Sequence, residues 1–414
     1  MRHSSSNPIS YIALSLTLCL QSGLANAGLS AELELRAAVS DTQQSWVNGG
    51  LGKNLFDESA RTIQLGRAAF RVETYLPGDV NAVVVADAHT ERRQLLDLQE
   101  AWLSWNPVPA GSWRTRLKVG AFFPASNLEL AYPGVGWTAQ NSISSSAANT
   151  WIGEELRMFG AELSWLRRGA FARSPHDFGM AFTVFGGNDP AGSLLAWRGW
   201  SVGDRITGIS ESLKLADLPA YRSTGPIPLQ RRDINLFREI DHRAGYAISA
   251  SYSYARRVEL QGLHYDNRGD PLAIEHGQYS WRTRFDQFGA RWHGAGQWEI
   301  LGQILDGQTV MGPNAVNVTF TAAYLMASRP LGAGRVAVRH DRFRTDEHDV
   351  LPEDPNEEQG YAWTVSYRLP LAKHWQLTME ALAITSSRPA RALLDESVRQ
   401  TERSVLAGLR WNFP

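Results

Sequence analysis

Apolar and polar side chains alternate with a period of two along much of this chain. Near the C-terminus, the residues between the apolar positions are mostly polar or glycine, and the apolar face carries Val405, Ala407, Leu409, Trp411 and Phe413. Residues 29–39 show the same alternation. A period of two is typical of a β-strand with one apolar and one wet face, and about ten residues cross a bilayer when the strand is tilted. These stretches therefore predict amphipathic strands that are long enough to span a membrane.

The same pattern predicts sixteen strands in all. They fall at about residues 29–39, 67–74, 80–89, 95–105, 113–121, 155–166, 177–186, 244–254, 258–266, 284–293, 297–306, 316–327, 334–343, 360–369, 374–384 and 402–413. The alternation is broken in the fourth, tenth and eleventh of them. We expect the last strand to pair with the first, because a closed sheet leaves no backbone edge facing lipid.

The connections between these strands differ in length in a regular way. Those after the second, fourth, eighth, tenth, twelfth and fourteenth strands are short, and the one after the sixth is moderate. Long connections follow the first, fifth, seventh, ninth, thirteenth and fifteenth strands, including loops at about 122–154 and 188–242. Such sorting is typical of membrane barrels. The sequence therefore predicts an all-β fold, a transmembrane antiparallel β-barrel of about sixteen strands with short periplasmic turns and long extracellular loops.

Tryptophan residues lie at or near the predicted strand ends. They are Trp102, Trp105, Trp113, Trp165, Trp292, Trp298, Trp363, Trp375 and Trp411. Because amphipathic rings prefer the boundary between lipid and water, these positions are consistent with two aromatic girdles. Ordinary packing of tryptophan in a protein core is the alternative interpretation.

The N-terminus carries the features of a secretory leader. Arg2 and His3 precede an apolar run at 11–20, and Ala25-Asn26-Ala27 has the small-x-small pattern of a cleavage site. We therefore expect residues 1–27 to be a cleaved signal peptide and 28–414 to form one barrel domain in the bacterial outer membrane. The only cysteine, Cys19, lies in the leader. A mature chain without cysteine excludes a disulfide framework, a cysteine nucleophile and a cysteine-ligated metal.

Composition and motifs argue against several other functions. The formal net charge is -1 and no long basic run is present, so no nucleic-acid partner is expected. The sequence contains no G-x-S-x-G, H-E-x-x-H, P-loop or G-x-G-x-x-G motif, and its histidines have no metal-ligand spacing. We therefore expect no enzyme activity, no metal and no cofactor. A serine and a histidine on neighbouring strands remain an open alternative, because such pairs need not be close in sequence.

Cations on the predicted lumen-facing sides of the strands are the candidate functional residues. Arg114, Arg116 and Lys118 alternate with outward-facing residues of the fifth predicted strand, and Arg67 and Arg71 face inward from the second. Cations along the wall of a pore favour anionic solutes. Acidic residues that also face inward offer an alternative role, cross-strand salt bridges in the wall, and the two roles are compatible.

Three of the predicted loops have distinctive compositions. The loop at 122–154 is rich in Ser, Asn and Gly, and the loop at 188–242 contains Trp197-Arg198-Gly199-Trp200. Loops of this length are usually functional or disordered, and the aromatic and basic content argues against simple disorder. The sequence does not say which of them enters the lumen. The acidic segment 345–359 predicts a solvated extracellular loop, with divalent cations shared with lipopolysaccharide as an alternative.

Two short runs of residues carry a family resemblance. They are Leu98-Gln99-Glu100-Ala101-Trp102-Leu103-Ser104-Trp105 and Leu117-Lys118-Val119-Gly120-Ala121-Phe122-Phe123-Pro124. These runs resemble the phosphate-selective porin O/P-like family of Gram-negative outer-membrane porins, in which a Glu-Ala-aromatic strand precedes a strand ending in Gly-x-Phe-x-x-Pro. The second motif is shortened here. The resemblance implies a trimeric channel that favours anions, and only part of the family's cation row is matched.

The sequence as a whole predicts an outer-membrane porin for ion transport and for passive diffusion of small hydrophilic solutes, anions among them. The expected partners are these solutes, outer-membrane lipid and lipopolysaccharide, and two further copies of the chain in a homotrimer. Three alternatives stay open: an outer-membrane enzyme, a receptor or structural barrel plugged by the loop at 188–242, and a soluble secreted β-protein.

Overall fold

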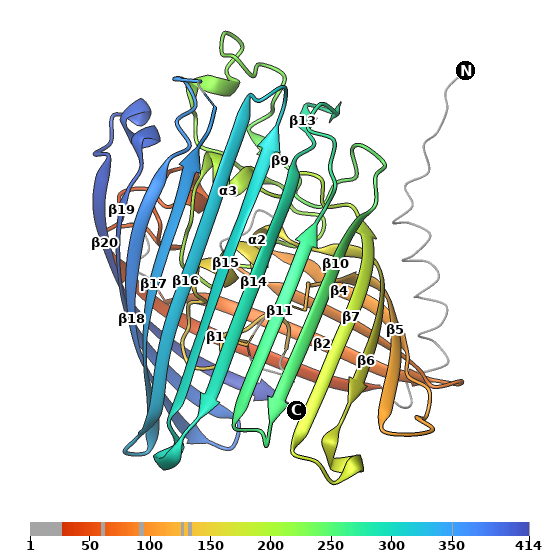
Figure 1. Cartoon of the computed structure of the whole chain (residues 1–414). Coiled ribbons are helices and arrows are strands. Elements are labelled where there is room, and N and C mark those ends of the chain that lie inside the picture. Colours follow the sequence, from red (N-terminus) through yellow and green to blue (C-terminus); the bar gives the residue numbers. More distant parts are fainter. Residues whose placement is uncertain are drawn as a thin grey trace.

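The computed structural model describes residues 27–58, 63–90, 95–125, 128–130, 135–349 and 351–413. The predicted leader up to residue 26, with Cys19, lies outside the described residues, as does Pro414. Sixteen strands form one closed antiparallel barrel (Figure 1). They are β1 (Gly28–Ser40), β2 (Ile63–Leu76), β3 (Val80–Ala88), β4 (Leu96–Trp105), β5 (Trp113–Phe122), β6 (Met158–Arg167), β7 (His176–Gly186), β10 (Gly245–Tyr254), β11 (Val258–Asp266), β14 (Arg282–His293), β15 (Glu299–Met311), β16 (Val316–Leu331), β17 (Gly334–Glu347), β18 (Glu358–Ala372), β19 (Trp375–Ser387) and β20 (Arg399–Phe413).

Short elements fill the connections. Two-stranded pairs are formed by β8 (Leu213–Lys214) with β9 (Asp233–Ile234) and by β12 (Ile274–Glu275) with β13 (Gln278–Tyr279). Among the described residues, the α-helices are α2 (Ala147–Glu155) and α3 (Ser193–Trp197). Short 3₁₀ helices lie at Trp46–Asn48, Gly169–Ala172, Pro219–Tyr221, Ala295–Gln297 and Pro389–Leu394. Within the described ranges, no helix has the length and hydropathy of a membrane-spanning segment.

The closing strand pairs with the first strand, as the sequence predicts. Ala37 lies opposite Ala407, and the β1–β20 register runs from Ala31–Phe413 to Ser40–Ser404. All sixteen predicted strands are confirmed, and so is the fold class. Closure matters physically because each backbone N–H and C=O of a strand then has a partner in a neighbouring strand, which a lipid environment requires.

Short turns and long loops lie at opposite ends of the barrel (Figure 1). The β2–β3 turn contains Gly78 and Asp79, both with φ near the left-handed region at 79° and 61°. Leu76 pairs with Val80, so the loop has three residues, and glycine and aspartate tolerate the positive φ values that it requires. The loops after β5 and β7 leave the other end. The predicted sorting of connections is therefore confirmed.

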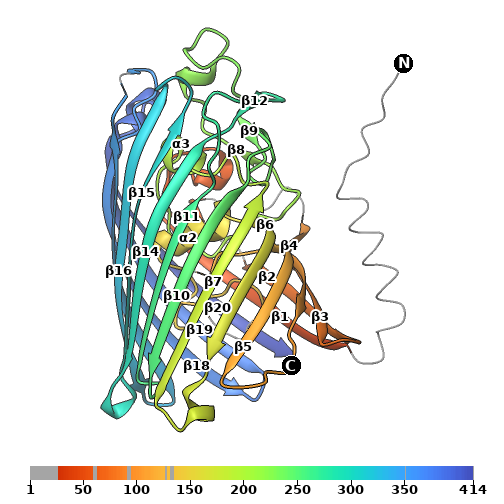
Figure 2. The same ribbon diagram turned by 45° about the vertical axis from the view of Figure 1, so that its right-hand side comes forward.

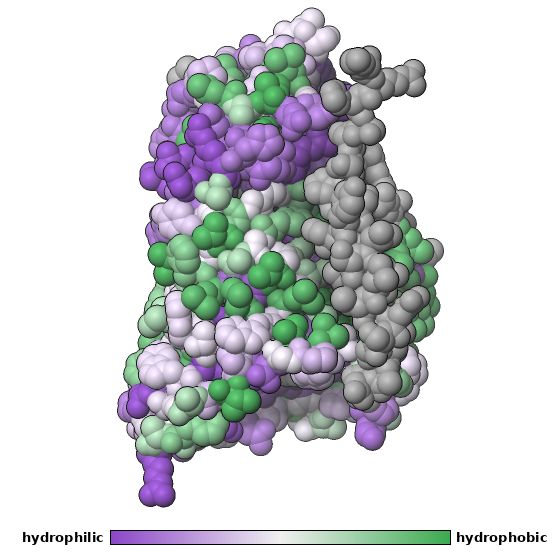
Figure 3. Space-filling view, turned by 90° about the vertical axis from the view of Figure 1, so that its right-hand side faces the viewer, coloured by the Kyte–Doolittle hydropathy of each residue, from purple (hydrophilic) through white to green (hydrophobic). Residues whose placement is uncertain are grey.

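The outer surface of the barrel is apolar in a band between two polar ends. On β1, Leu33, Leu35 and Val39 are exposed, whereas Glu34 and Arg36 are buried inside. Figure 3 shows the band below a polar cap of extracellular residues. A surface that is apolar over the width of a hydrocarbon layer and polar above and below it is what a transmembrane barrel presents to lipid.

Two β-bulges break the alternation near the N-terminal strands. Between β3 and β4, Val85 pairs with Glu100 and Ala86 pairs with Leu98, so that Gln99 is the extra residue and its side chain is buried. This bulge explains the irregular pattern of the fourth predicted strand, because one extra residue shifts every following side chain to the other face. The β1–β2 bulge contains Gly66, where an added Cβ would lie 2.9 Å from the Arg36 Cβ.

Irregular alternation in β14 and β15 has another cause. These two strands pair without a register shift over twelve residue pairs, from Arg282–Val310 to His293–Glu299. Their extracellular ends carry exposed polar residues on the outer face, such as Arg284, Asp286 and Asp306. The strands therefore continue beyond the apolar band, and the outward side chains change from apolar to polar where they do.

Candidate functional site in the barrel lumen

The connection from β5 to β6, residues 123–157, folds into the barrel, and we call it the inner loop (Figure 2). On one side of the lumen, the Gln261 Nε2 of β11 donates to the Ala125 carbonyl at 2.8 Å, and Arg291 of β14 donates to the Leu128 carbonyl. On the opposite side, the Arg67 Nη2 of β2 donates to the Val135 carbonyl at 2.9 Å. The inner loop therefore crosses the lumen and is held by both walls.

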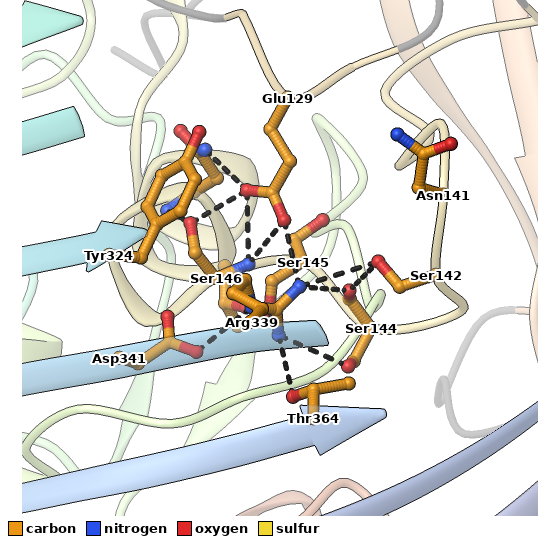
Figure 4. A network of polar contacts seen from close by, with 12 residues as sticks. Glu129, Asn141, Ser142, Ser144, Ser145, Ser146, Tyr324, Arg339, Asp341 and Thr364 are labelled. Atoms are coloured by element: carbon orange, nitrogen blue, oxygen red, sulfur yellow. Dashed lines mark hydrogen bonds and ion pairs between the residues drawn. The ribbon is translucent and has the colours of Figure 1, made fainter. Parts of the chain in front are cut away.

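A buried network of polar contacts holds the middle of the inner loop (Figure 4). The Arg339 side chain of β17 donates to the carbonyls of Ser144 at 2.7 Å and Ser145 at 2.9 Å. It also pairs with Glu129 of the loop at 2.8 Å and with Asp341 of its own strand at 2.9 Å. Charge-assisted hydrogen bonds of this kind are strong, and burial makes the loss of any partner costly.

The same carboxylates cap the N-terminus of α2. Glu129 accepts from the Ser146 N–H at 2.9 Å, and Asp341 accepts from the Ala147 N–H at 3.0 Å. The first N–H groups of a helix have no partner within the helix, and its N-terminus carries a partial positive charge. A carboxylate from the loop and one from the wall therefore fix where the helix begins and how it lies against β17.

Three further strands contribute contacts to the inner loop. Glu380 of β19 accepts from the Ile143 N–H at 2.7 Å, and the Asn141 Nδ2 donates to Glu299 of β15 at 2.8 Å. The Ser366 Oγ of β18 donates to the Asn141 carbonyl at 2.5 Å. Inward-facing polar residues of several strands thus bind the inner loop and hold it in position.

Helix α2 packs an aromatic core against the lumen wall. Trp151 is fully buried, with its ring centroid 5.3 Å from both Phe285 of β14 and Phe320 of β16. Trp200, from the connection between β7 and β10, lies 6.1 Å from Trp151. Aromatic rings in such contacts exclude water from the space between them. The lumen beside β14 to β17 is therefore filled by side chains at this level.

The connection from β7 to β10, residues 187–244, contains Trp200, and we call it the long loop. The Arg388 side chain donates to the Ala196 carbonyl at 2.6 Å, and the Lys53 Nζ donates to the Arg198 carbonyl at 2.9 Å. The Trp197 Nε1 donates to Asp354 at 3.0 Å. Both long connections that the sequence singles out therefore enter the barrel, the long loop from its extracellular end (Figure 2).

Asp354 belongs to the segment 345–359, which the sequence predicts to be a solvated loop. That prediction is wrong for the acidic residues Asp349, Asp354 and Glu358, which are buried. Glu358 pairs with the buried Lys53 at 2.7 Å. Asp354 and Glu358 bind groups of loops that enter the lumen and come from distant parts of the sequence. Asp349 instead accepts from the Asn317 N–H of β16 at 2.7 Å.

Glu155 at the end of α2 has an unusual environment for a carboxyl group. It accepts from the Ser193 Oγ at 3.0 Å and the Leu194 N–H at 2.9 Å, and also from the Trp151 Nε1. Burial raises the pKa of Glu155 to about 7, although the hydrogen bonds from Leu194 and Trp151 act in the opposite direction. This carboxyl joins α2 to the start of α3, and thus the inner loop to the long loop.

One group of carboxylates has its oxygen atoms close enough together to hold a metal ion. Among the described residues, ligand atoms of Asp189, Glu239 and Asp241 lie within 4.8 Å of one another. Asp189 accepts from the Asp241 N–H at 3.1 Å, and Glu239 accepts from the Gly187 N–H at 2.8 Å. Backbone N–H groups therefore already occupy oxygens of this group, which organises the base of the long loop.

A cavity of about 880 Å³ remains beside the opposite part of the wall, and we call it the periplasmic cavity. It is lined by β2 to β7, β10 and β11, with Ala125 of the inner loop, and it extends to the short turns at Asp79, Asn106 and Arg168. Its lining is polar and charged, with Ser164, Ser249 and other small residues between longer side chains. The arrangement leaves room for water and small solutes along one side of the barrel.

The five sequence-predicted site residues divide into two sets. Arg71, Arg114 and Arg116 line the periplasmic cavity. Arg67 does not: only 3% of its surface is exposed, and it holds the inner loop. Lys118 is buried against Glu162 at 3.2 Å, with its Nζ 3.8 Å from the centre of the Phe122 ring.

Acidic residues accompany two of the three arginines of the cavity. Arg116 lies 3.1 Å from Glu162, and Arg71 lies 2.9 Å from Glu73. Arg114 forms no ion pair with any residue that the structure describes. Ion pairs within the wall therefore account for some of these cations, and Arg114 faces the open cavity.

The residues that hold the inner loop could be found only in part from the sequence. Arg339 and Glu380 lie in predicted strands, on the faces that alternate with apolar residues, and this pattern places them inside the barrel. Their partners are backbone groups of residues 141–147, and no spacing in the sequence connects them. The sequence therefore indicated that Arg339 and Glu380 face the lumen, but it did not indicate which residues they contact.

The sequence matches no protein-family model, and no curated protein matches it either. Solved structures do share its fold, which is that of the sixteen-stranded porin-type barrels of Gram-negative outer membranes. The outer membrane channel DcaP of Acinetobacter baumannii is 9% identical, with a TM-score of 0.56 over 94% of this chain and 98% of that one. The anion-selective porin from Comamonas acidovorans is 10% identical, with a TM-score of 0.50 over 94% and 99%. The trimer form of OmpT, an outer membrane protein of Vibrio cholerae, is 7% identical, with a TM-score of 0.51 over 94% and 100%.

Proposed function

We propose that this barrel is an outer-membrane channel through which small hydrophilic solutes diffuse passively. The observation that carries the proposal is the periplasmic cavity, a polar space of about 880 Å³ left open beside β2 to β7 while the loops fill the other side. Pores select by size and by the charges along their walls. The inner loop sets the size of the opening, and the wall beneath it sets the charge.

The proposal includes a preference for anions. Arg114 and Arg116 line the periplasmic cavity near its periplasmic mouth, and Arg71 lines it from β2. Fixed cations at the entrance of a low-dielectric passage raise the local concentration of anions. Glu73 and Glu162 line the same space and reduce the effect, so we expect a moderate preference rather than strict selection. The anion-selective porin from Comamonas acidovorans shares the fold, which is consistent with this role.

The proposal also covers the setting of the protein. We propose that residues 1–27 direct export and are removed, that the mature chain resides in the outer membrane, and that three copies associate. The trimer form of the Vibrio cholerae protein supports the last point by its shared fold alone. No catalytic step is needed for diffusion.

Conductance in a planar lipid bilayer tests the proposal. Purified protein should produce stepwise increases in current, because each inserted barrel adds a fixed conductance. A salt gradient then measures selectivity from the potential at zero current, which should have the sign expected for anions. Failure to observe any steps after verified insertion contradicts the channel function.

The arginines are tested by changing their charge. The double variant Arg114→Glu and Arg116→Glu should move the zero-current potential toward cation preference, because two cations at the cavity wall become anions. Arg282→Glu and Arg284→Glu together are the matched control, because these two arginines are exposed on the outer face of β14, away from the lumen. An unchanged potential in the double variant would remove these arginines from the selectivity mechanism.

A further inference from the structure

A groove of about 630 Å³ lies on the outside of the barrel, near the extracellular ends of β16 to β20, and we call it the outer groove. Its lining alternates along the strands with residues that face the lumen. The outward-facing part consists of Thr321, Ala323, Arg342, Arg344, Asp346, Gln359, Tyr361, Thr385, Ser387 and Arg399. None of these side chains takes part in the lumen contacts described above.

The height of the outer groove follows from the direction of the strands. β17 runs from a short turn at residues 332–333 toward the extracellular end, so Arg342 and Arg344 lie farther from the periplasm than His340. The His340 ring packs 4.3 Å from Trp363, which is half exposed on the outer wall. Outward-facing tryptophan marks the edge of the hydrocarbon layer. The groove therefore lies just above that edge, at the level of lipid headgroups.

The outer groove has a cationic rim and a floor of small polar side chains. Arg342 and Arg399 form no ion pair with any part of the chain that the structure describes, whereas Arg344 pairs with Asp346. The three arginines exceed the single carboxylate in charge. Thr385 and Ser387 supply hydroxyl groups between the rims, and the Thr385 Oγ1 lies 3.0 Å from that of Thr401. Guanidinium groups bind phosphate through paired N–H donors, and hydroxyl groups add further donors.

We propose that the outer groove binds the phosphate groups of a phosphorylated lipid in the outer leaflet. The charge of the groove fits phosphate, and its height fits a headgroup whose acyl chains lie along the apolar wall below. Val365 and Val405 are exposed on the neighbouring strands beneath the groove, and they offer the surface that acyl chains contact. A free phosphate ion would use the cationic rim but not the apolar wall. The inference depends on the proposed membrane location and is independent of solute transport.

Native mass spectrometry of the detergent-solubilised full chain tests this site. The probe is a glycolipid with two phosphates, compared with the same lipid after removal of its phosphates. The intact protein should retain the phosphorylated lipid at least about tenfold more strongly, because each lost charge-assisted contact accounts for about tenfold in affinity. The double variant Arg344→Gln and Arg399→Gln should lose most of this difference.

A matched double variant controls for the general effect of removing surface cations. Arg282→Gln and Arg284→Gln change two exposed arginines on the outer face of β14, where Asp266 and Asp286 are their neighbours. This variant should retain the lipid as the unchanged protein does. Equal loss in both double variants would overturn the site, as would equal retention of the lipid without phosphates. Displacement of the lipid by millimolar inorganic phosphate would assign the groove to free phosphate and also overturn the proposal.

Planar-bilayer conductance keeps this test separate from the proposed channel function. The Arg344→Gln and Arg399→Gln variant should conduct normally, because the outer groove does not contact the lumen. Lipid binding in a barrel that does not conduct would leave this site intact and contradict the channel alone.

Discussion

Arg339 illustrates how a single buried side chain determines the form of the lumen. It is fully buried and contacts Glu129, Asp341 and the carbonyls of Ser144 and Ser145. In water a guanidinium has no fixed hydrogen-bond partners. Here its five N–H donors face acceptors from the barrel wall and from the inner loop. The residue therefore acts as a positioning residue for the inner loop.

Replacing Arg339 with alanine should release residues 141–147 from the wall. Removal of one partner leaves Glu129 and Asp341 buried without their cation, which costs about 3 kcal/mol. Hydrogen exchange of the backbone in 141–147 should become much faster, whereas strand β17 should stay protected. Arg284→Ala on the outer face is the control, because its one described contact is with Gln308 at 3.1 Å. Unchanged exchange in Arg339→Ala would show that the network does not hold the loop.

Glu155 should make the contact between the two loops depend on pH. Its pKa in the folded protein is about 7, above its value of 4.5 in the unfolded chain, because burial favours the neutral form. The stabilisation of the folded protein by the neutral Glu155 carboxyl is therefore fully present below pH 4.5 and is lost as the pH rises through 7. Hydrogen exchange in 147–155, corrected for intrinsic rates, should be faster at pH 8 than at pH 5.

Glu155→Gln should remove most of this pH dependence, since the amide keeps a similar shape and does not ionise. Ser193 and Leu194 can still donate to its oxygen. If the variant and the unchanged protein respond equally to pH, another group controls the contact.

At the scale of whole elements, the inner loop connects two strands, β5 and β6, that pair directly and do not require a long connection. Phe122 at the end of β5 pairs directly with Met158 at the start of β6. A short turn could therefore connect the two strands, because adjacent antiparallel strands can be joined by two residues. The loop is thus an addition to a complete barrel.

Replacing residues 124–156 with a short Gly-rich turn should give a barrel that folds and conducts several-fold more current. The wider lumen offers a larger cross-section, and the strand pairs that carry the fold remain. Deletion of Ser223 and Thr224, exposed residues of the long loop, is the control and should leave conductance unchanged. A conductance that stays the same after removal of the inner loop would show that this loop does not restrict the passage.

The strands could be predicted from the sequence because the alternation within each strand is determined by that strand's own surroundings. Alternation along β1 or β20 requires no knowledge of the rest of the chain, since lipid and lumen impose the two faces on every strand. The inner loop could not be predicted in this way. Its position depends on Arg67, Gln261 and Arg339, which lie far from it in sequence, and its own polar composition also suits a solvated loop.

The same reasoning explains where the candidate cations lie. Alternation correctly predicts that Arg67 and Lys118 face inward, but it contains no information about what else enters the lumen. Once the inner loop is in place, these two side chains are buried, and Arg114 and Arg116 remain beside open space.

The whole molecule combines a closed barrel with a lumen that is filled unevenly. Aromatic packing around Trp151 occupies the side beside β14 to β17, and the periplasmic cavity lies along β2 to β7. The proposed route for solutes is therefore off the barrel axis. Because the mature chain is expected to have no cysteine, single cysteines can be introduced to locate the route.

Modification of single cysteines during conductance recording tests this route most directly. Ser251→Cys places a thiol in the lining of the periplasmic cavity, and Ser366→Cys places one on β18 beneath the inner loop, where only 2% of the serine is exposed. A charged thiol reagent should reduce the current through Ser251→Cys channels and leave Ser366→Cys channels unchanged. Block at Ser366→Cys without block at Ser251→Cys would contradict the proposed passage.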